Sequence, residues 1–369
     1  MERLRLAGVA LAFAIVFLWH WEALAHDITI DTSAAEAVVE ALGNPQLTEA
    51  EARRLTQLPA NRALIQRMTN YAPNLGEDRF VIELVASAHH QAVNDRGYYR
   101  FDQVRDNRDA VIRTIAAFKR DPAGNATWID QRLAPFSPGR PLRLQGFLIA
   151  GGRPTGFTLG GPSFYLNIGR FGDEPLAARV TLAHELFHAV QSEALRSMGR
   201  SEDEFQLTRY QSFDSRMERN RYAVRAYLTN LLQEGLAHYV GDPMLMANEG
   251  PYSRSTRDQL QGLLARPELL AGLLEVSLVA ITADRPAAFQ DAYGVGFYGW
   301  ASPMYALGYQ IAKAIDERRG RQRLRELVVG SGCDFVNEYL MLTREDTGLP
   351  PLGPETRRLV GEACREPGT

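Results

Sequence analysis

The sequence predicts an α+β fold that is mostly helical and contains a small mixed sheet. Long stretches before residue 134 and after residue 175 repeat apolar residues every three or four positions, as one face of a helix does. Between them, residues 142–171 have an extended pattern and are rich in glycine. The 369 residues are 45% hydrophobic and 23% charged, a composition typical of a folded globular protein.

The amino terminus has the pattern of a secretory signal peptide. Three charged residues within positions 2–5 precede an almost wholly apolar run over 6–19, and Ala23-Leu24-Ala25 offers the small residues of a cleavage site. We therefore expect residues 1–25 to be removed, which would place the mature protein in the periplasm or outside the cell. An uncleaved membrane anchor is the alternative, but the apolar run is shorter than the roughly 20 residues of a membrane span.

Residues 26–140 are expected to form a helical N-terminal region. Its helices each show one apolar face, and we expect them over residues 33–42, 48–58, 79–92 and 106–119. The second opens with Thr48 and carries Glu51 three residues later, the pattern of a capping box. A cluster of proline and glycine over residues 134–141 then breaks the helical pattern and predicts a boundary to a second domain, residues 141–369.

The second domain is expected to begin with strands and to continue with helices. Residues 142–150 and 163–171 are the predicted strands, because apolar and polar side chains alternate in the second one. Pro175 then opens a helix, since proline is tolerated in a first turn where its missing N–H would have no partner. Later helices are expected over residues 221–240, 256–264, 267–281 and 304–318.

The chain has two cysteines, Cys333 and Cys364, near its carboxyl end. In an oxidising compartment such a pair predicts a disulfide, with two buried, unpaired thiols as the alternative. Neither cysteine has histidine neighbours at ligand spacing, so we do not expect either to bind a metal.

The helix that begins at Pro175 carries His184, Glu185 and His188 in an otherwise apolar stretch. Residues four apart lie on the same helical face, about 6 Å from each other, so both imidazoles can reach one ion. Glu185 sits one residue further round, within reach of a water on that ion. This is the HExxH pattern of metalloproteases, in which zinc lowers the pKa of a bound water and the glutamate takes its proton.

A third ligand is expected from a second helix, since catalytic zinc uses three protein ligands and keeps one position open. Glu234 lies on the predicted helix over residues 221–240, and the neighbouring Gly235 would leave room near a metal.

The stretch HELFH at 184–188, followed by EGLA at 234–237, resembles the gluzincin class of zinc metallopeptidases. More loosely, it is similar to zinc-dependent peptidases found among exported bacterial proteins. The resemblance covers about residues 152–316 and implies a zincin-like domain, in which a small sheet with an edge strand packs on the HExxH helix. It implies Zn²⁺ as cofactor, Glu185 as general base, and a peptide or protein as substrate.

Several gluzincins have a tyrosine in a Tyr-x-x-Gly stretch after the third ligand, and its hydroxyl stabilises the oxyanion. The stretch from Tyr305 to Gly308 is similar, so the resemblance implies that Tyr305 is this donor. A core aromatic residue on an amphipathic helix is the alternative for Tyr305. Tyr293 and Tyr298, in a glycine-rich loop, are weaker candidates.

Other polar residues near these motifs have expected supporting roles. His238 follows Glu234 by one helical turn and is expected to orient a ligand. An alternative metal ligand, a substrate contact and an ordinary helix-surface histidine are the other interpretations. Asp242 is expected to stop the helix, with hydrogen bonding to His184 or His188 as a minor alternative. His89 and His90 have no carboxylate at ligand spacing, so we expect them to be structural.

The sequence also disfavours several classes of protein. The net charge of −3 predicts no nucleic-acid partner, and no membrane partner is expected after signal cleavage. The aminopeptidase branch of the gluzincins anchors a free amino terminus with a Gly-x-Met-Glu-Asn stretch, which the chain does not contain, so a strict amino-terminal exopeptidase is disfavoured. Two other functions stay open, a non-catalytic exported zinc-binding protein and a zinc hydrolase acting on a non-peptide amide or ester.

Overall fold

The computed structural model describes residues 25–92, 97–137, 140–200, 205–247, 250–298 and 302–365. The expected signal peptide lies outside the described residues, apart from Ala25. Within these ranges, no helix combines the length and the apolar character that a membrane crossing would need.

The predicted small mixed sheet is confirmed and has four strands in the order β1-β2-β4-β3. The strands are β1 (Asp27–Asp31), β2 (Arg143–Ile149), β3 (Gly156–Phe157) and β4 (Ser163–Asn167). β1, β2 and β4 run parallel to one another, whereas β3 pairs antiparallel with β4 and forms one edge. The predicted strand over 163–171 ends early, because the chain turns into the 3₁₀ helix η4 (Ile168–Arg170).

Strand β1 corrects the prediction that residues 26–140 are entirely helical. It pairs with β2 in parallel register from Asp27 opposite Arg143 to Asp31 opposite Phe147. A run of five residues carries little periodicity of its own, and the strand that it pairs with lies far along the chain. The boundary near residue 140 stays a prediction, although the sheet joins segments from both sides of it.

The rest of the N-terminal region is helical, as predicted. Its elements are α1 (Ser33–Leu42), α2 (Glu49–Leu55), α3 (Pro59–Tyr71), η1 (Pro73–Leu75), α4 (Glu77–Ala88), α5 (Phe101–Asp106), α6 (Arg108–Arg120), α7 (Pro122–Leu133) and η3 (Ala134–Phe136). The capping box is present, since Thr48 accepts from the Glu51 N–H while the Glu51 carboxylate accepts from the Thr48 N–H. The helix expected over 106–119 starts at Arg108, because Asn107 departs from helical geometry and separates α5 from α6.

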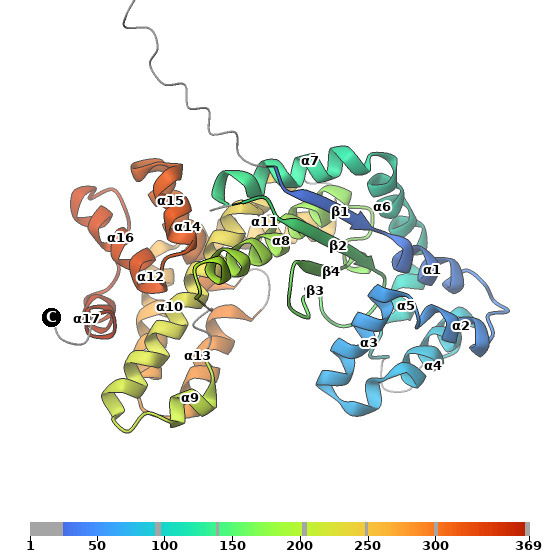
Figure 1. The fold of residues 1–369 in the computed structure, drawn as a ribbon, viewed down its shortest axis with the longest axis horizontal. Helices are drawn as coiled ribbons and strands as arrows, with labels where there is room; N and C mark the ends of the chain where they lie inside the picture. Colours follow the sequence, from blue (N-terminus) through green and yellow to red (C-terminus); the bar gives the residue numbers. More distant parts are fainter. Residues whose placement is uncertain are drawn as a thin grey trace, which may run out of the picture.

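Beyond β4 the described chain is almost wholly helical. The elements are α8 (Pro175–Ser197), α9 (Leu207–Gln211), α10 (Arg216–Val240), η5 (Pro243–Leu245), α11 (Pro251–Leu264), α12 (Pro267–Ile281), α13 (Pro286–Phe297), α14 (Pro303–Arg319), α15 (Arg321–Val328), α16 (Gly332–Glu345) and α17 (Pro354–Ala363). Figure 1 shows the sheet and α8 between the N-terminal helices α1 to α5 on one side and α14 to α17 on the other. The predicted mostly helical α+β class is therefore confirmed.

Glycines let three central helices approach one another unusually closely. A Cβ on Gly235 of α10 would lie 2.5 Å from the Cα of Gly308 on α14, which is closer than any side chain allows. A Cβ on Gly241, just after α10, would lie 2.6 Å from the Cβ of His184 on α8. The backbones of α8, α10 and α14 therefore meet around His184 and Glu234.

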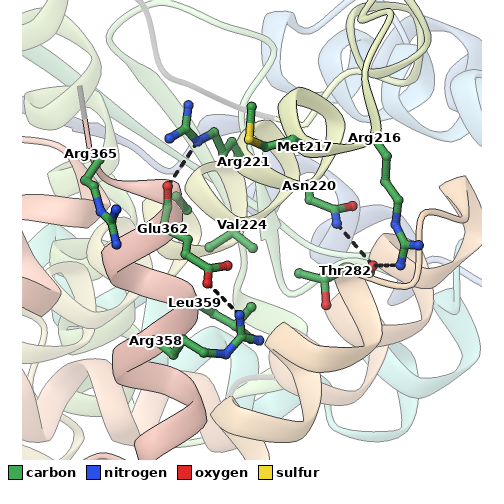
Figure 2. Close-up of a pocket in the computed structure, with 11 residues that line it drawn as sticks. Arg216, Met217, Asn220, Arg221, Val224, Thr282, Arg358, Leu359, Glu362 and Arg365 are labelled. Carbon is green, nitrogen blue, oxygen red and sulfur yellow. Dashed lines mark hydrogen bonds and ion pairs between the residues drawn. The ribbon is translucent and has the colours of Figure 1, made fainter. Parts of the chain in front are cut away.

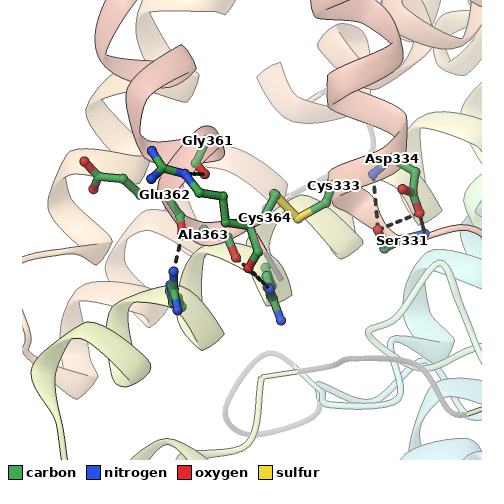
Figure 3. Close-up of a disulfide and its surroundings, with 10 residues drawn as sticks. Ser331, Cys333, Asp334, Gly361, Glu362, Ala363 and Cys364 are labelled. Atoms are coloured by element: carbon green, nitrogen blue, oxygen red, sulfur yellow. Dashed lines mark hydrogen bonds between the residues drawn. A yellow bond between two sulfur atoms is a disulfide. The ribbon is translucent and has the colours of Figure 1, made fainter. Parts of the chain in front are cut away.

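Helix α17 packs along the amino-terminal half of α10. Both helices line a pocket of about 600 Å³ (Figure 2). We call it the arginine pocket, and its lining residues are Arg216, Met217, Asn220, Arg221, Val224, Thr282, Arg358, Leu359, Glu362, Ala363 and Arg365. Beside it, the predicted disulfide is confirmed: Cys333 in α16 is bonded to Cys364 at the end of α17, with their Cα atoms 5.7 Å apart (Figure 3).

Candidate metal centre

Helix α8 carries the HExxH segment through the interior of the protein. Leu182, Ala183, Leu186 and Phe187 are completely buried around it, and the His184 side chain is only 1% exposed. Polar side chains in such surroundings are costly unless other groups satisfy them. The burial of His184 therefore indicates that its ring has a specific partner or ligand.

The structure brings the three predicted ligands together. His184 Nε2 lies 3.5 Å and His188 Nε2 lies 3.4 Å from Oε2 of Glu234, and the two Nε2 atoms are 3.3 Å apart. Ligand atoms bound about 2.0–2.2 Å from a tetrahedral zinc lie roughly 3.3–3.6 Å from one another. The three observed separations match those of one triangular face of such a site.

The donor atoms also fit a cation chemically. Glu234 Oε2 is buried and has no hydrogen-bond partner among the described residues, although both imidazoles face it. Two imidazole nitrogens and one carboxylate oxygen are a typical catalytic zinc set, which leaves a fourth corner for water or substrate. The described residues thus fit a zinc site with three protein ligands.

Burial and charge set the protonation states of the three ligands. Burial lowers the pKa of His184 to about 4, although Glu234 acts against this shift. Burial also lowers the pKa of His188, but the carboxylates of Glu234 and Glu185 outweigh it and raise this pKa to about 9. Burial raises the pKa of Glu234, but the two histidines outweigh that effect and bring it below its usual range. Binding a cation at neutral pH therefore requires His188 to give up a proton.

Glu185 lies beside the candidate ligands and lines the cleft onto which they open. Burial raises the pKa of its carboxyl to about 8, with a further contribution from Glu234 and an opposing one from His188. A carboxyl group with a pKa near neutrality can both accept and donate a proton at physiological pH.

Tyr305 and His238 pack directly on the ligands. The Tyr305 ring is stacked on that of His184 with centroids 6.0 Å apart, and the nearby Glu234 and Glu185 carboxylates add to the effect of burial in raising the pKa of its hydroxyl. His238 is 1% exposed, and its ring centroid lies 5.7 Å from that of His184 and 5.5 Å from that of Tyr305. The alternative of a surface position for His238 is therefore wrong.

The remaining sequence candidates lie away from the candidate ligands, except Tyr293, which lines the cleft; the prediction that it lies in a glycine-rich loop is wrong, because it belongs to helix α13. Tyr298 is 82% exposed, and the Asp242 carboxylate accepts from the Met244 N–H at the start of η5. Asp242 therefore caps the start of η5, directly after α10 ends at Val240 with Gly241 as its C-cap. His89 interacts with the backbone oxygen of Leu47, which agrees with a structural role.

One residue that the sequence analysis did not single out also contacts a ligand. Gln191 Oε1 lies 2.9 Å from Nδ1 of His188, and the Gln191 side chain is buried. Its place three residues after His188 puts it on the same helical face, a signal that the sequence contained.

The ligands open onto a cleft of about 720 Å³. The edge strand β3 and the loop that follows it line one wall, and α8, α10 and the two tyrosines line the others. The lining residues are Phe157, Thr158, Gly160, Gly161, Ser163, Phe164, His184, Glu185, His188, Ala189, Ser192, Arg196, Arg200, Gln206, Asn230, Gln233, Glu234, Tyr293 and Tyr305. The arrangement can accommodate an extended chain beside an edge strand and over a metal.

Comparison with known proteins agrees with this chemistry. The family model described as "Putative zinc dependent peptidase" (DUF5700) matches residues 52–348, a range that contains the three candidate ligands. No curated protein and no solved structure matches the chain. The match covers well over half of the sequence, and the chain therefore belongs to this family of zinc-dependent peptidases.

Proposed function

We propose that this protein is a metallopeptidase of the gluzincin type, in which His184, His188 and Glu234 hold zinc. The observation that carries the proposal is the triangle formed by the two Nε2 atoms and the buried Glu234 Oε2, with sides of 3.3, 3.4 and 3.5 Å. A zincin-like arrangement is supported by α8 packing against β2 and β4, with the edge strand β3 on the cleft wall.

Glu185 is the proposed general base and acid. Bound zinc would polarise the scissile carbonyl and lower the pKa of the attacking water. Glu185 takes a proton from that water and then gives it to the nitrogen of the leaving amine, which balances the hydrolysis of one peptide bond. Its carboxyl, with a pKa raised to about 8, suits the donating step at neutral pH.

Tyr305 is the proposed donor to the oxyanion. Its hydroxyl lies at the ligand group and the residue lines the cleft, so it is positioned beside the reacting carbonyl. In this role the hydroxyl donates a hydrogen bond to the oxyanion. Tyr293 is a second cleft-lining hydroxyl next to it.

The edge strand supports a peptide as the substrate. Thr155 accepts from the Asn167 N–H, and Phe157 pairs with Tyr165, so the backbone of these two residues faces β4. Backbone groups alternate along an antiparallel strand, and those of Gly156 therefore face away from β4. A substrate backbone can add to this free edge as a further strand.

We also propose that the protein is exported. The signal-like amino terminus supports this localisation, and so does the Cys333–Cys364 disulfide, because such bonds persist mainly in oxidising compartments.

Replacing Glu185 with Gln tests the proposed function. We expect hydrolysis of a peptide library to fall by about 10²- to 10⁴-fold, because the base is lost, while metal analysis finds the same zinc content as in the wild type. Glu193→Gln on the same helix is the matched control, since Glu193 pairs with Arg140 and Arg196 and should leave turnover unchanged. Full activity of Glu185→Gln would contradict the assigned role.

The same assay separates the two alternatives. Wild-type protein that binds zinc but cleaves no peptide, ester or amide would support a non-catalytic zinc-binding protein. Cleavage of esters or non-peptide amides alone would support a zinc hydrolase that acts on these substrates instead of on peptides.

A further inference from the structure

Gln191 joins the two helices that carry the ligands. It is 1% exposed and lies on α8 with its Oε1 2.9 Å from Nδ1 of His188. Its Nε2 donates across to the backbone carbonyl of Gln233 on α10, at 3.2 Å. Gln233 directly precedes Glu234, so one amide contacts a ligand on one helix and the neighbour of a ligand on the other.

The Gln233 carbonyl determines which way the amide points. A carbonyl oxygen can only accept a hydrogen bond, so the amide nitrogen of Gln191 has to face Gln233. The amide oxygen then faces His188, and because this oxygen also only accepts, Nδ1 of His188 has to carry a proton. The opposite orientation would place two acceptors against each other in a buried position, which is costly.

We propose that Gln191 is a positioning residue that fixes the tautomer and the ring orientation of His188, so that Nε2 presents its lone pair to the metal. The inference rests on the proposed zinc site. His188 Nε2 is the atom that faces Glu234 Oε2, whereas Nδ1 is held by Gln191 on the opposite side of the ring. The fixed carbonyl of α10 thus orients a ligand on α8 through one side chain.

The two histidines differ in how much support they need. His184 is buried on all sides, and its ring packs on His238 and Tyr305. The His188 side chain is 27% exposed in the cleft, so packing restrains its ring less. The hydrogen bond between Nδ1 of His188 and Gln191 restrains the ring, because the side of the ring that faces the cleft has less packing to hold it. Partners of this kind typically change metal affinity by about 10- to 100-fold.

Two substitutions separate the orienting role from a purely structural one. Gln191→Met has a similar shape and loses both hydrogen bonds, whereas Gln191→Glu keeps an acceptor for Nδ1 but cannot donate to Gln233. Gln310→Met is the matched control, because it removes an amide that donates to the Tyr339 hydroxyl, away from the metal. Zinc affinity is measured by competition with a chelator, and the His188 ring proton by ¹⁵N-edited NMR of the zinc-loaded protein.

We expect Gln191→Met to bind zinc about 10- to 100-fold more weakly and its His188 Nδ1 proton to exchange faster with solvent. Gln191→Glu should recover most of the affinity and keep the proton protected, and Gln310→Met should match the wild type.

Several results would overturn the proposal. It would be overturned if Gln191→Met kept the zinc affinity and the proton protection of the wild type. It would also be overturned if Gln191→Met and Gln191→Glu lost equal zinc affinity, because Gln191 would then only link the two helices. A proton on Nε2 instead of Nδ1 in the wild type would overturn it without any variant. Wild-type protein that binds no zinc would instead refute the proposed metal site itself.

Discussion

Helix α10 borders two hollows of similar size and very different chemistry. Its carboxyl-terminal half carries Glu234, which lines the cleft of about 720 Å³ at the candidate metal centre; we call it the metal cleft. Its amino-terminal half borders the arginine pocket of about 600 Å³. Both contain several charged side chains. The difference between them lies in what those charges already contact.

In the arginine pocket the charged groups hold the helices to one another. Arg221 Nε donates to the backbone oxygen of Glu362 at the end of α17, and Arg216 donates to that of Thr282 after α12 (Figure 2). Arg358 forms an ion pair with the Glu362 carboxylate. Cations near a helix carboxyl terminus interact favourably with its unpaired carbonyls, so Arg221 fastens the end of α17 to α10 and Arg216 fastens the end of α12 to it, whereas the Arg358–Glu362 pair lies within α17.

In the metal cleft three polar atoms converge on one point instead. Glu234 Oε2 is buried and accepts no hydrogen bond from the part of the chain that the structure describes, and the Nε2 atoms of His184 and His188 both face it. Only a cation or a proton can satisfy this arrangement. Convergent, unsatisfied polar atoms therefore indicate a binding site more reliably than the volume of a pocket does.

Glu234→Gln should produce the largest effect. The neutral amide is a poor zinc ligand, so we expect the affinity to fall by more than the roughly 100-fold seen when an outer partner of a ligand is lost. Chelator competition measures the affinity, and circular dichroism should show that the metal-free variant keeps its fold. Unchanged affinity would mean that Glu234 is not a ligand.

Removing the disulfide should lower the stability of the region around the arginine pocket. Replacing Cys333 and Cys364 with alanine opens a loop with a sequence separation of 31 residues, which should lower the free energy of unfolding by about 3–4 kcal/mol. Denaturant unfolding measures this loss. Zinc affinity should stay at the wild-type value, because the bond fastens α17 beside the arginine pocket. A parallel loss of zinc affinity would show that the two regions are coupled.

Gly308→Ala probes the contact that places Glu234 and Tyr305 next to each other. The new methyl group would lie 2.5 Å from the Cα of Gly235 and 2.7 Å from the backbone oxygen of Leu231, so α10 and α14 must separate. We expect a loss of about 1–3 kcal/mol in the free energy of unfolding, together with weaker zinc binding.

Gly272→Ala is the matched control for this substitution. No atom lies within 4 Å of its added Cβ on α12, and alanine should stabilise the helix by up to about 1 kcal/mol. Wild-type stability and zinc affinity in Gly308→Ala would contradict the tight contact.

Much of this arrangement could be predicted because it is local in the sequence. HExxH places His184 and His188 on one helical face by spacing alone, and the bounds of α1 and α12 follow from their periodicity and their end signals. The EGLA and Tyr-x-x-Gly stretches pointed to Glu234 and Tyr305. That Gly235 and Gly308 are the contact between these two stretches could not be read from either one alone.

The parts that were missed depend on contacts between distant segments. β1 is recognisable only with β2 beside it. The spacing of Gln191 places it on the same helical face as His188, but the orientation of its amide depends on a carbonyl of α10 that no local pattern reveals. The alternative of a surface position for His238 arose because a histidine on a helix shows its burial only when α8 and α14 are placed against it.

Arg221→Ala should have the smallest effect and provides the closest test of the comparison. It removes the hydrogen bond to the Glu362 carbonyl at a partly exposed position, so we expect the free energy of unfolding to fall by about 1 kcal/mol or less. Zinc affinity and turnover should not change. Arg216 and Arg221 donate to backbone carbonyls and Arg358 to a carboxylate, so the pocket has no arginine among these three that waits for an anion. Added phosphate should therefore raise the melting temperature of the wild type no more than it raises that of Arg221→Ala. A phosphate-dependent rise that this variant lacks would make the arginine pocket an anion site, and the contrast between the two hollows would then no longer hold.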